Sequence, residues 1–310
     1  CKSVIQIDDG DRIAGLVSQA FHRTMSGRPG PVAVALPEDM LRDLTVVSDA
    51  KQYKVARPNM AALDVEALRN FLEKAKRPIA ILGGGGWSAE ACNNFASFSA
   101  ANNIPVTTSF RCQDFIDNEL SCYVGELGTT VSPKLANRIK EADLLLVVGA
   151  RMGEMTTSIY ELLDIPVPKQ KLVHVYMEPS ELGRVYTPDL AIIASMESFA
   201  AAVAKMPIIK NSCWAEWTRD LRSEQLANWE PSIPMVGELD MHVVMKHLNQ
   251  VLPDDAILTN DAGNFSGWPQ RFYRYRQYRT QLAPTSGAMG YGIPAAIAAR
   301  AIYPDRIVIG

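Results

Sequence analysis

The sequence predicts an α/β protein built from doubly wound domains, in which helices cover both faces of parallel sheets. Helix-like and strand-like segments alternate through the middle of the chain, between about residues 64 and 206. The strand-like segments are near-continuous apolar runs, such as PIAILGG at 78–84 and DLLLVVGA at 143–150. Such runs are typical of strands buried on both faces, and their alternation with helices favours parallel pairing.

The composition is that of a globular chain with balanced charge. Of its 310 residues, 47% are hydrophobic and 21% are charged, which leaves room for two or more cores. Lys and Arg number 31 against 34 Asp and Glu, so we expect neither nucleic acid nor an anionic membrane as partner. No membrane-spanning run or signal peptide is visible, and we expect a cytoplasmic protein.

The five cysteines and four histidines show no zinc-binding spacing. We expect most of the cysteines to be reduced and buried, and no metal site made from these residues alone.

The first 45 residues predict one helix and one strand. Apolar residues recur at helical spacing from Ile13 to Phe21, with Asp9 or Asp11 as the cap. The turn SGRPG then precedes the apolar strand PVAVAL. One helix and one strand cannot bury their apolar faces alone, so we expect this segment to be the end of a larger domain.

A polar, proline-containing stretch at 44–63 predicts a linker before the middle segment. In the middle segment we expect helices at 64–75, 88–102, 132–140 and 196–206, and strands at 78–84, 104–109, 143–150, 171–177 and 190–195. Near 207–234 the alternation of helix-like and strand-like segments stops, and we expect a helix and a proline-bounded connection there. For the last segment we expect a helix at 240–251, a strand at 255–261, a helix at 294–302 and a final strand.

The stretch from Asn260 to Arg300 has the clearest functional pattern. One glycine-containing turn follows a strand, and a second, SGAMGYG at 286–292, leads into Pro294 and an alanine-rich helix. Proline is favoured at a helix start, and the glycines before it leave backbone N–H groups open. Such a corner can hold a phosphate. The alternative is a tight strand-to-helix turn without a ligand.

Between these turns, arginines alternate with aromatic residues in RFYRYRQYR, residues 271–279. This pattern can indicate nucleic-acid binding, but the net charge is −3 and no wider basic surface is evident. We therefore expect a solvated or subunit-contacting helix face. Trp268 is expected in the core.

A run of glycines at 83–86 stands between a strand and a helix, where open α/β sheets hold nucleotide phosphates. It is not a full G-x-G-x-x-G pattern, and no acidic residue closes the next strand. Ligands in such sheets bind at the carboxyl ends of the strands. We therefore expect one crevice to be lined by Thr108 and Ser109, Gly149 and Arg151, and 177–181.

Several of these motifs together carry a resemblance. The pair NDAGNFSGW (260–268) and TSGAMGYGIPAAIAA (285–299), followed by YPDRIVIG, resembles the diphosphate-binding domain of thiamine-diphosphate enzymes of the acetolactate synthase type. SGRPGPVAVALPEDM (26–40) resembles the end of their pyrimidine-binding domain. AILGGGGWS (80–88) to MEPSELGR (177–184) resembles their central, Rossmann-like domain. The resemblance implies a remnant of the pyrimidine-binding domain at 1–45, a central domain at 57–207 and the first part of the diphosphate-binding domain at 235–310.

The resemblance implies cofactor-binding positions in both glycine turns. Gly263, Asn264 and Phe265 match the first diphosphate loop, although related flavin-containing enzymes commonly have Gln-His there. The second loop matches at Ser286, Gly287, Ala288 and Met289. Ser286 can bind phosphate or only cap the turn. Met289 matches the bulky residue that wedges the cofactor into its bent form, and a flexible thioether suits an irregular gap; the alternative is an ordinary core methionine.

In the acetolactate synthase subgroup the central crevice holds FAD. Five residues match flavin-contacting positions: Arg28, Gly84, Gly85, Arg151 and Glu181. The chain departs from the subgroup at Met155, which replaces an arginine, and at Tyr176, which replaces an aspartate. We therefore expect an empty or ADP-like crevice rather than one that holds FAD. The absence of the arginine at Met155 also argues against the use of a second 2-oxoacid as substrate.

The resemblance implies a thiamine-diphosphate-dependent lyase or carboligase acting on a small 2-oxoacid, with Mg2+ as second cofactor and a homodimer or homotetramer as assembly. The activating glutamate would precede Cys1 and the magnesium-binding Gly-Asp-Gly would begin at or after Gly310, so we expect this chain to be an inactive fragment with no catalytic residue or metal ligand of its own. Two alternatives remain: a 2-oxoacid or acyl-CoA decarboxylase of the same family, and a non-catalytic nucleotide-binding module.

Overall fold

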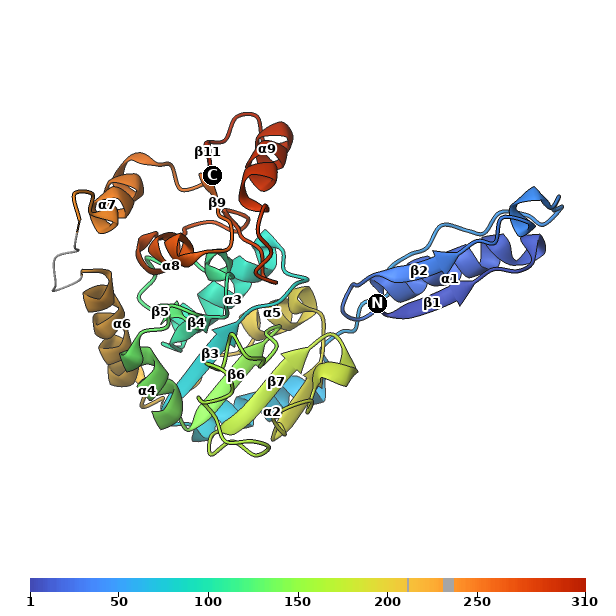
Figure 1. Ribbon diagram of the computed structural model, residues 1–310. Helices are drawn as coiled ribbons and strands as arrows, with labels where there is room; N and C mark the ends of the chain where they lie inside the picture. Colours follow the sequence, from blue (N-terminus) through green and yellow to red (C-terminus); the bar gives the residue numbers. More distant parts are fainter. Residues whose placement is uncertain (211, 231–236) are drawn as a thin grey trace. The chain divides into compact units, whose positions relative to one another are not determined.

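The computed structural model describes residues 1–210, 212–230 and 237–310. The chain folds into two compact units (Figure 1). One contains residues 1–58 with 177–179, and the other contains residues 59–176 and 180–310. The division into three domains stays a prediction, and most of the expected proline-bounded connection lies outside the described residues.

The first unit is a small parallel pair of strands covered by one helix. Strand β1 (Ser3–Gln6) pairs with β2 (Val32–Ala35), and helix α1 (Ile13–Met25) packs on them. The Asp9 carboxylate accepts the N–H of Asp11 and caps a short 3-10 turn, Gly10–Arg12, that leads into α1. Helix α1 itself follows Arg12 and has no side-chain cap, so the prediction that Asp9 or Asp11 caps this helix is wrong. The sequence analysis missed β1. Val4 and Phe21 remain largely exposed, so this unit buries only part of its apolar surface.

The second unit is organised around a six-stranded, all-parallel sheet, which confirms the predicted fold class. Its strand order is β5-β4-β3-β6-β7-β8, so the direction of winding reverses between β3 and β6. The strands are β3 (Pro78–Leu82), β4 (Val106–Thr108), β5 (Tyr123–Glu126), β6 (Leu144–Val148), β7 (Lys171–Tyr176) and β8 (Leu190–Ile193). Every residue of β3 and β6 is buried, as their apolar runs indicated. Strand β5 was not predicted.

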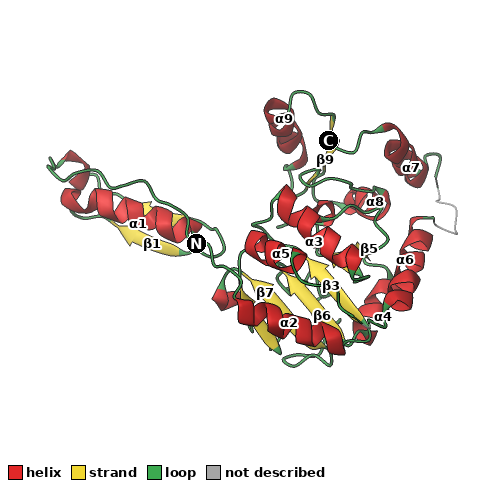
Figure 2. Cartoon of the chain, turned by 180° about the vertical axis from the view of Figure 1, so that it is seen from behind, coloured by secondary structure: helices red, strands yellow, loops and turns green. Residues whose placement is uncertain are grey.

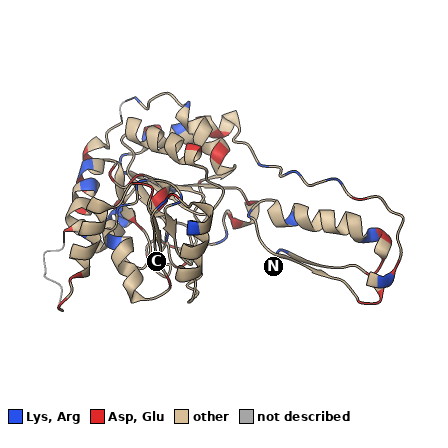
Figure 3. Ribbon diagram, turned by 90° about the horizontal axis from the view of Figure 1, so that it is seen from above, with Lys and Arg blue, Asp and Glu red and all other residues tan. Residues whose placement is uncertain are grey.

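Helices cover both faces of this sheet. Helices α2, α3 and α5 lie on the face turned toward the viewer in Figure 2, and α4 lies on the other. Their bounds are Ala62–Lys74 for α2, Ala89–Ala101 for α3, Pro133–Glu141 for α4 and Met196–Ala204 for α5. Among the described helices none is both long and apolar enough to cross a membrane. Acidic and basic residues are interspersed on the same elements (Figure 3).

After α5, the described residues form helix α6 and then a last segment with a smaller sheet and helices α7, α8 and α9. Strand β9 (Ile257–Thr259) lies between β10 (Gln281–Leu282) and β11 (Val308–Ile309), all parallel. The helices are α6 (Ala215–Trp229), α7 (Met241–Val251), α8 (Gly267–Phe272) and α9 (Gly292–Ile302). Helix α9 begins two residues before Pro294, which therefore lies within its first turn, where its missing N–H costs no helical hydrogen bond.

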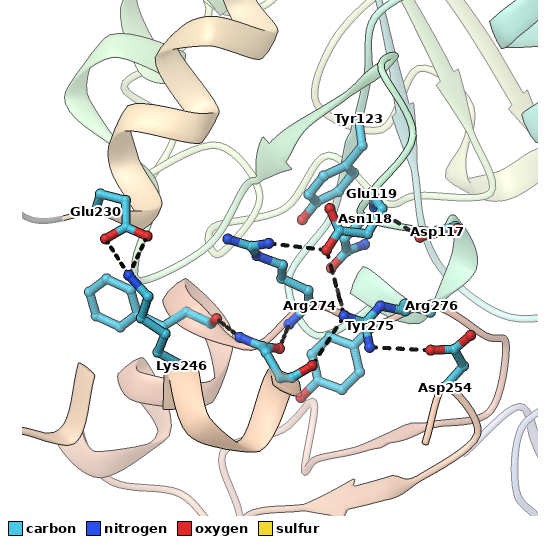
Figure 4. Close-up of polar contacts among 12 residues, drawn as sticks. Asp117, Asn118, Glu119, Tyr123, Glu230, Lys246, Asp254, Arg274, Tyr275 and Arg276 are labelled. Atoms are coloured by element: carbon cyan, nitrogen blue, oxygen red, sulfur yellow. Dashed lines mark hydrogen bonds and ion pairs between the residues drawn. The ribbon is translucent and has the colours of Figure 1, made fainter. Parts of the chain in front are cut away.

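The arginine and aromatic segment is not the helix face that we expected from the sequence. Helix α8 ends at Phe272, and the following residues are extended, with Tyr273 and Tyr275 buried. Backbone and side chain of Asn118 pair with the backbone of Tyr275 at 2.9 and 3.0 Å. Arg274 contacts Glu119 at 3.1 Å (Figure 4). The segment thus packs against the loop that follows β4, and the helix prediction is wrong for residues 273–279.

Three of the five cysteines are buried, as expected, and all five are free: Cys1, Cys92, Cys112, Cys122 and Cys213. Burial raises the pKa of the Cys92 thiol to about 12 and those of Cys112 and Cys122 to about 11. These three thiols are therefore protonated and poorly nucleophilic at neutral pH.

The glycine run after β3 lets two backbone segments approach at the point where the winding reverses. A Cβ on Gly84 would lie 1.8 Å from the carbonyl oxygen of Gly149, and Gly84 has a φ of +72°. Gly149, at the end of β6, has a φ of +71°. Both positions therefore require glycine for the fold itself, whether or not a ligand binds there.

We predict that Gly84→Ala lowers the free energy of unfolding by roughly 2–4 kcal/mol, because the added methyl group meets backbone and the left-handed conformation becomes strained. Urea denaturation measures this effect. Gly85→Ala is the matched control, since a Cβ there meets no atom within 4 Å. Equal destabilisation by the two variants would contradict the packing argument.

Candidate cofactor-binding site

The second glycine turn already holds an anion, the side chain of Asp261. The Asp261 carboxylate follows β9 and accepts the N–H of Gly290 at 2.8 and 2.9 Å and that of Gly292 at 3.3 Å. The backbone N–H of Ala262, followed by those of Gly292 and Gly290, lowers the pKa of Asp261. The expectation of open N–H groups is therefore wrong for Gly290 and Gly292.

The remainder of this turn is solvent-exposed. The N–H of Gly287 donates to Pro284, and a Cβ on Gly287 would meet no atom within 4 Å. The side chain of Met289 is 86% exposed, so the alternative of a core methionine is wrong. Its role as a wedge stays a prediction.

The first glycine turn follows β9 and runs into a short 3-10 helix, Asn264–Ser266, and then α8. The ring of Phe265 lies over Gly263, where a Cβ would be 2.6 Å from it, and Phe265 is 55% exposed. A residue with a side chain at position 263 would displace this ring. The turn thus presents backbone and an apolar side chain to solvent.

A cavity of about 650 Å³ brings both glycine turns together with the carboxyl ends of three strands of the large sheet. Four predicted positions line it: Gly263, Asn264, Ser286 and Gly287. Phe265, Ala288 and Met289 are not among its lining residues. The other lining residues are Phe110, Arg111, Thr129, Thr130, Glu154, Met155, Ser266, Gly267 and Thr285. The cavity has the size of a small-molecule site.

Arg111, which follows β4 and lines this cavity, was not predicted from the sequence. Its side chain is buried, Nη1 donates to the carbonyl of Pro284, and its backbone has a φ of +59°. Burial lowers the pKa of the guanidinium, whereas the negative charge of Asp261 raises it. The only signal in the sequence was an arginine at the carboxyl end of a buried strand.

Glu126 at the end of β5 was also missed. One carboxylate oxygen accepts the hydroxyl of Thr130, a cavity-lining residue, and Oε2 is buried without a hydrogen-bond partner among the described residues. Burial raises the pKa of Glu126 from 4.5 to about 7, more than the Thr130 bond lowers it. A buried carboxyl group that titrates near neutral pH thus lies behind the cavity wall.

The predicted nucleotide crevice is less well defined. Gly84 contacts Gly149 closely, Gly85 borders open space and Arg151 is exposed. Glu181 forms an ion pair with Arg184 at 3.4 Å. Arg28 belongs to the other unit, and its placement with these residues stays a prediction.

The sheet, the glycine turns and the cavity define a doubly wound α/β protein with a cavity large enough for a small molecule. Two family models match the chain: "Thiamine pyrophosphate enzyme, central domain" at residues 65–203 and "Thiamine pyrophosphate enzyme, C-terminal TPP binding domain" at residues 261–310. The chain therefore belongs to the thiamine pyrophosphate enzyme family.

Similar proteins carry the name acetolactate synthase. The large subunit from Parasynechococcus marenigrum is 28% identical, and the match covers 98% of this chain and 50% of that protein. The Escherichia coli isozyme 1 large subunit is 28% identical over 96% of this chain and 52% of its own length. Acetolactate synthase 3, chloroplastic, from Brassica napus is 28% identical, and the match covers 99% of this chain and 47% of that protein. The chain thus spans about half the length of the curated relatives it matches.

We predict that Glu126→Gln flattens the pH dependence of stability between about pH 4.5 and 7. The folded protein keeps the Glu126 proton up to about pH 7, whereas the unfolded chain releases it near 4.5. The stability from this group is therefore complete below pH 4.5 and is lost as the pH rises through 7, by roughly 3 kcal/mol.

Thermal or urea unfolding at several pH values, compared between wild type and variant, measures this difference. Glu90→Gln, at an exposed position, controls for loss of a carboxylate. An unchanged pH profile in Glu126→Gln would show that Glu126 is ionised in the folded protein.

Proposed function

We propose that this chain is part of a thiamine-diphosphate-dependent lyase or carboligase that acts on a small 2-oxoacid. One observation carries the proposal: a single cavity is lined by residues from both predicted diphosphate loops and from the carboxyl ends of β4, β5 and β6. Ligands of doubly wound proteins bind at this end of the strands. The family membership and the names of the similar proteins support the same class of enzyme.

The residues of the cavity fit the diphosphate end of the cofactor. Gly263 and Gly287 allow close approach to backbone, and the side chains of Asn264 and Ser286 supply polar groups. Since Asp261 occupies two N–H groups of the α9 end, the diphosphate would be held upstream, at residues 286–289. When bound, the cofactor supplies an electron sink for an acyl carbanion.

We propose that the complete enzyme also uses Mg2+, held by a Gly-Asp-Gly segment, and a glutamate that activates the cofactor. Among the described residues no group of three or more His, Cys, Asp or Glu side chains is placed to hold a metal ion. Homodimers or homotetramers in the cytoplasm are the proposed assembly and location.

A decarboxylase of the same family is the second candidate. Met155 lines the cavity and is 40% exposed, where the acetolactate synthase pattern has an arginine. An apolar side chain there favours a reaction that uses only one 2-oxoacid. Product analysis with pyruvate distinguishes acetaldehyde, expected of a decarboxylase, from a carboligation product.

FAD is not required by the glycine run. The close contact of Gly84 with Gly149 accounts for that glycine without a nucleotide. We propose an empty or ADP-like crevice, and a flavin spectrum from the purified complete enzyme would overturn this.

We predict that Met289→Ala weakens thiamine diphosphate binding in the complete enzyme at least about tenfold and lowers turnover, without changing stability. The stability is expected to hold because the side chain is 86% exposed and so contributes little packing. Calorimetric titration of thiamine diphosphate with Mg2+ measures the affinity, and thermal unfolding measures the stability.

Met25→Ala, a partly exposed methionine of the first unit, is the matched control. Wild-type enzyme that binds no thiamine diphosphate would refute the proposed function and favour a non-catalytic nucleotide-binding module. Wild-type binding with an unaffected Met289→Ala variant would refute only the wedge.

A further inference from the structure

Arg111 stands apart from the other residues that line the cavity. Among the described residues that line the cavity it is the only Lys or Arg, and it is 8% exposed. Nη1 donates to the carbonyl of Pro284, but Nε is buried and has no hydrogen-bond partner in the part of the chain that the structure describes. A buried guanidinium donor without an acceptor is costly.

Burial lowers the pKa of the Arg111 guanidinium, and a nearby carboxylate opposes this effect. That carboxylate is Asp261, whose charge opposes burial most strongly, yet no ion pair between Asp261 and Arg111 is found among the described residues. The Asp261 carboxylate is instead bound by the glycine turn. A guanidinium with an unused N–H donor at a cavity wall is suited to a planar oxyanion.

The neighbouring groups support an anionic ligand. Thr129, Thr130, Thr285 and Ser286 contribute hydroxyl groups to the same lining, and these can donate to an oxyanion. The left-handed backbone at Arg111, with a φ of +59°, costs free energy in a residue other than glycine. The surrounding structure therefore holds the backbone of this arginine in a strained conformation at the cavity.

We propose that Arg111 is the anion-binding residue of this cavity and takes the oxyanion of the bound molecule, which is either the carboxylate of the 2-oxoacid or the diphosphate of the cofactor. The identity of these two ligands rests on the proposed function, but the anion site itself does not. Met155 carries no charge, so Arg111 is the lining residue that can supply a positive charge to a substrate carboxylate.

The test uses the complete enzyme without thiamine diphosphate. Inorganic pyrophosphate and oxalate, as probes for the two oxyanions, are titrated calorimetrically into wild type, Arg111→Gln and Arg111→Lys. Arg111→Gln is expected to lose about 10- to 100-fold in affinity for one probe, and Arg111→Lys to lose less, because lysine keeps the charge but not the planar fork. A lower affinity for oxalate would indicate that Arg111 binds the substrate carboxylate. A lower affinity for pyrophosphate would indicate that it binds the cofactor diphosphate.

Arg276→Gln is the matched control, because Arg276 lies outside this cavity and pairs with Asp254 at 3.2 Å. Unchanged affinity for both probes in the Arg111 variants, or an equal loss in Arg276→Gln, would overturn the inference. If Arg111→Gln does not fold, the affinity of Arg111→Lys for the two probes tests the inference instead. Unchanged affinity of that variant for both probes would overturn the inference too. Anion binding through Arg111 in an enzyme that binds no thiamine diphosphate would refute the proposed function and leave this inference standing.

Discussion

A buried set of polar contacts fixes the last segment of the chain on the end of the large sheet. The loop after β4 supplies Gln113, which exchanges hydrogen bonds with Gln281 at 2.9 Å each, and Asp114, whose carboxylate accepts the N–H groups of Thr280 and Gln281. All four residues are buried. Removing one partner would leave another polar group buried and unpaired, so the arrangement is specific as well as stabilising. The cavity exists because this contact brings the glycine turns against strands β4, β5 and β6.

The Asp261 carboxylate and a bound diphosphate would compete for the N-terminus of α9. The N-terminus of α9 favours an anion, and the chain provides it with its own, Asp261. A diphosphate placed at residues 286–289 would lie near this carboxylate and be repelled by it. A positive charge on the same wall would offset the repulsion, and Arg111 is the cation that the lining contains. The carboxylate organises the turn, and in the proposed site the arginine would make an anionic ligand tolerable beside it.

Much of this fold could be predicted from local pattern, whereas the cavity could not. Strands β3 and β6 were evident because each is a continuous apolar run. Strand β5 (YVGE) was missed because it is short and contains both a glycine and an acid. The alternation of Tyr273 and Tyr275 with arginines has a period of two, which is typical of extended chain, but it was interpreted as helical.

Long-range contacts explain the remaining omissions. Arg111 reaches Pro284 across 173 residues, and no local pattern marks such a pair. No local pattern indicates, either, that the nucleotide crevice and the cavity both use residues of the connection that follows β6. Gly149 packs against Gly84 at the reversal of winding, and Glu154 and Met155, a few residues on, line the cavity. The close approach of Gly84 and the cavity wall at Met155 thus depend on one short stretch of chain after β6, which no local sequence pattern indicates.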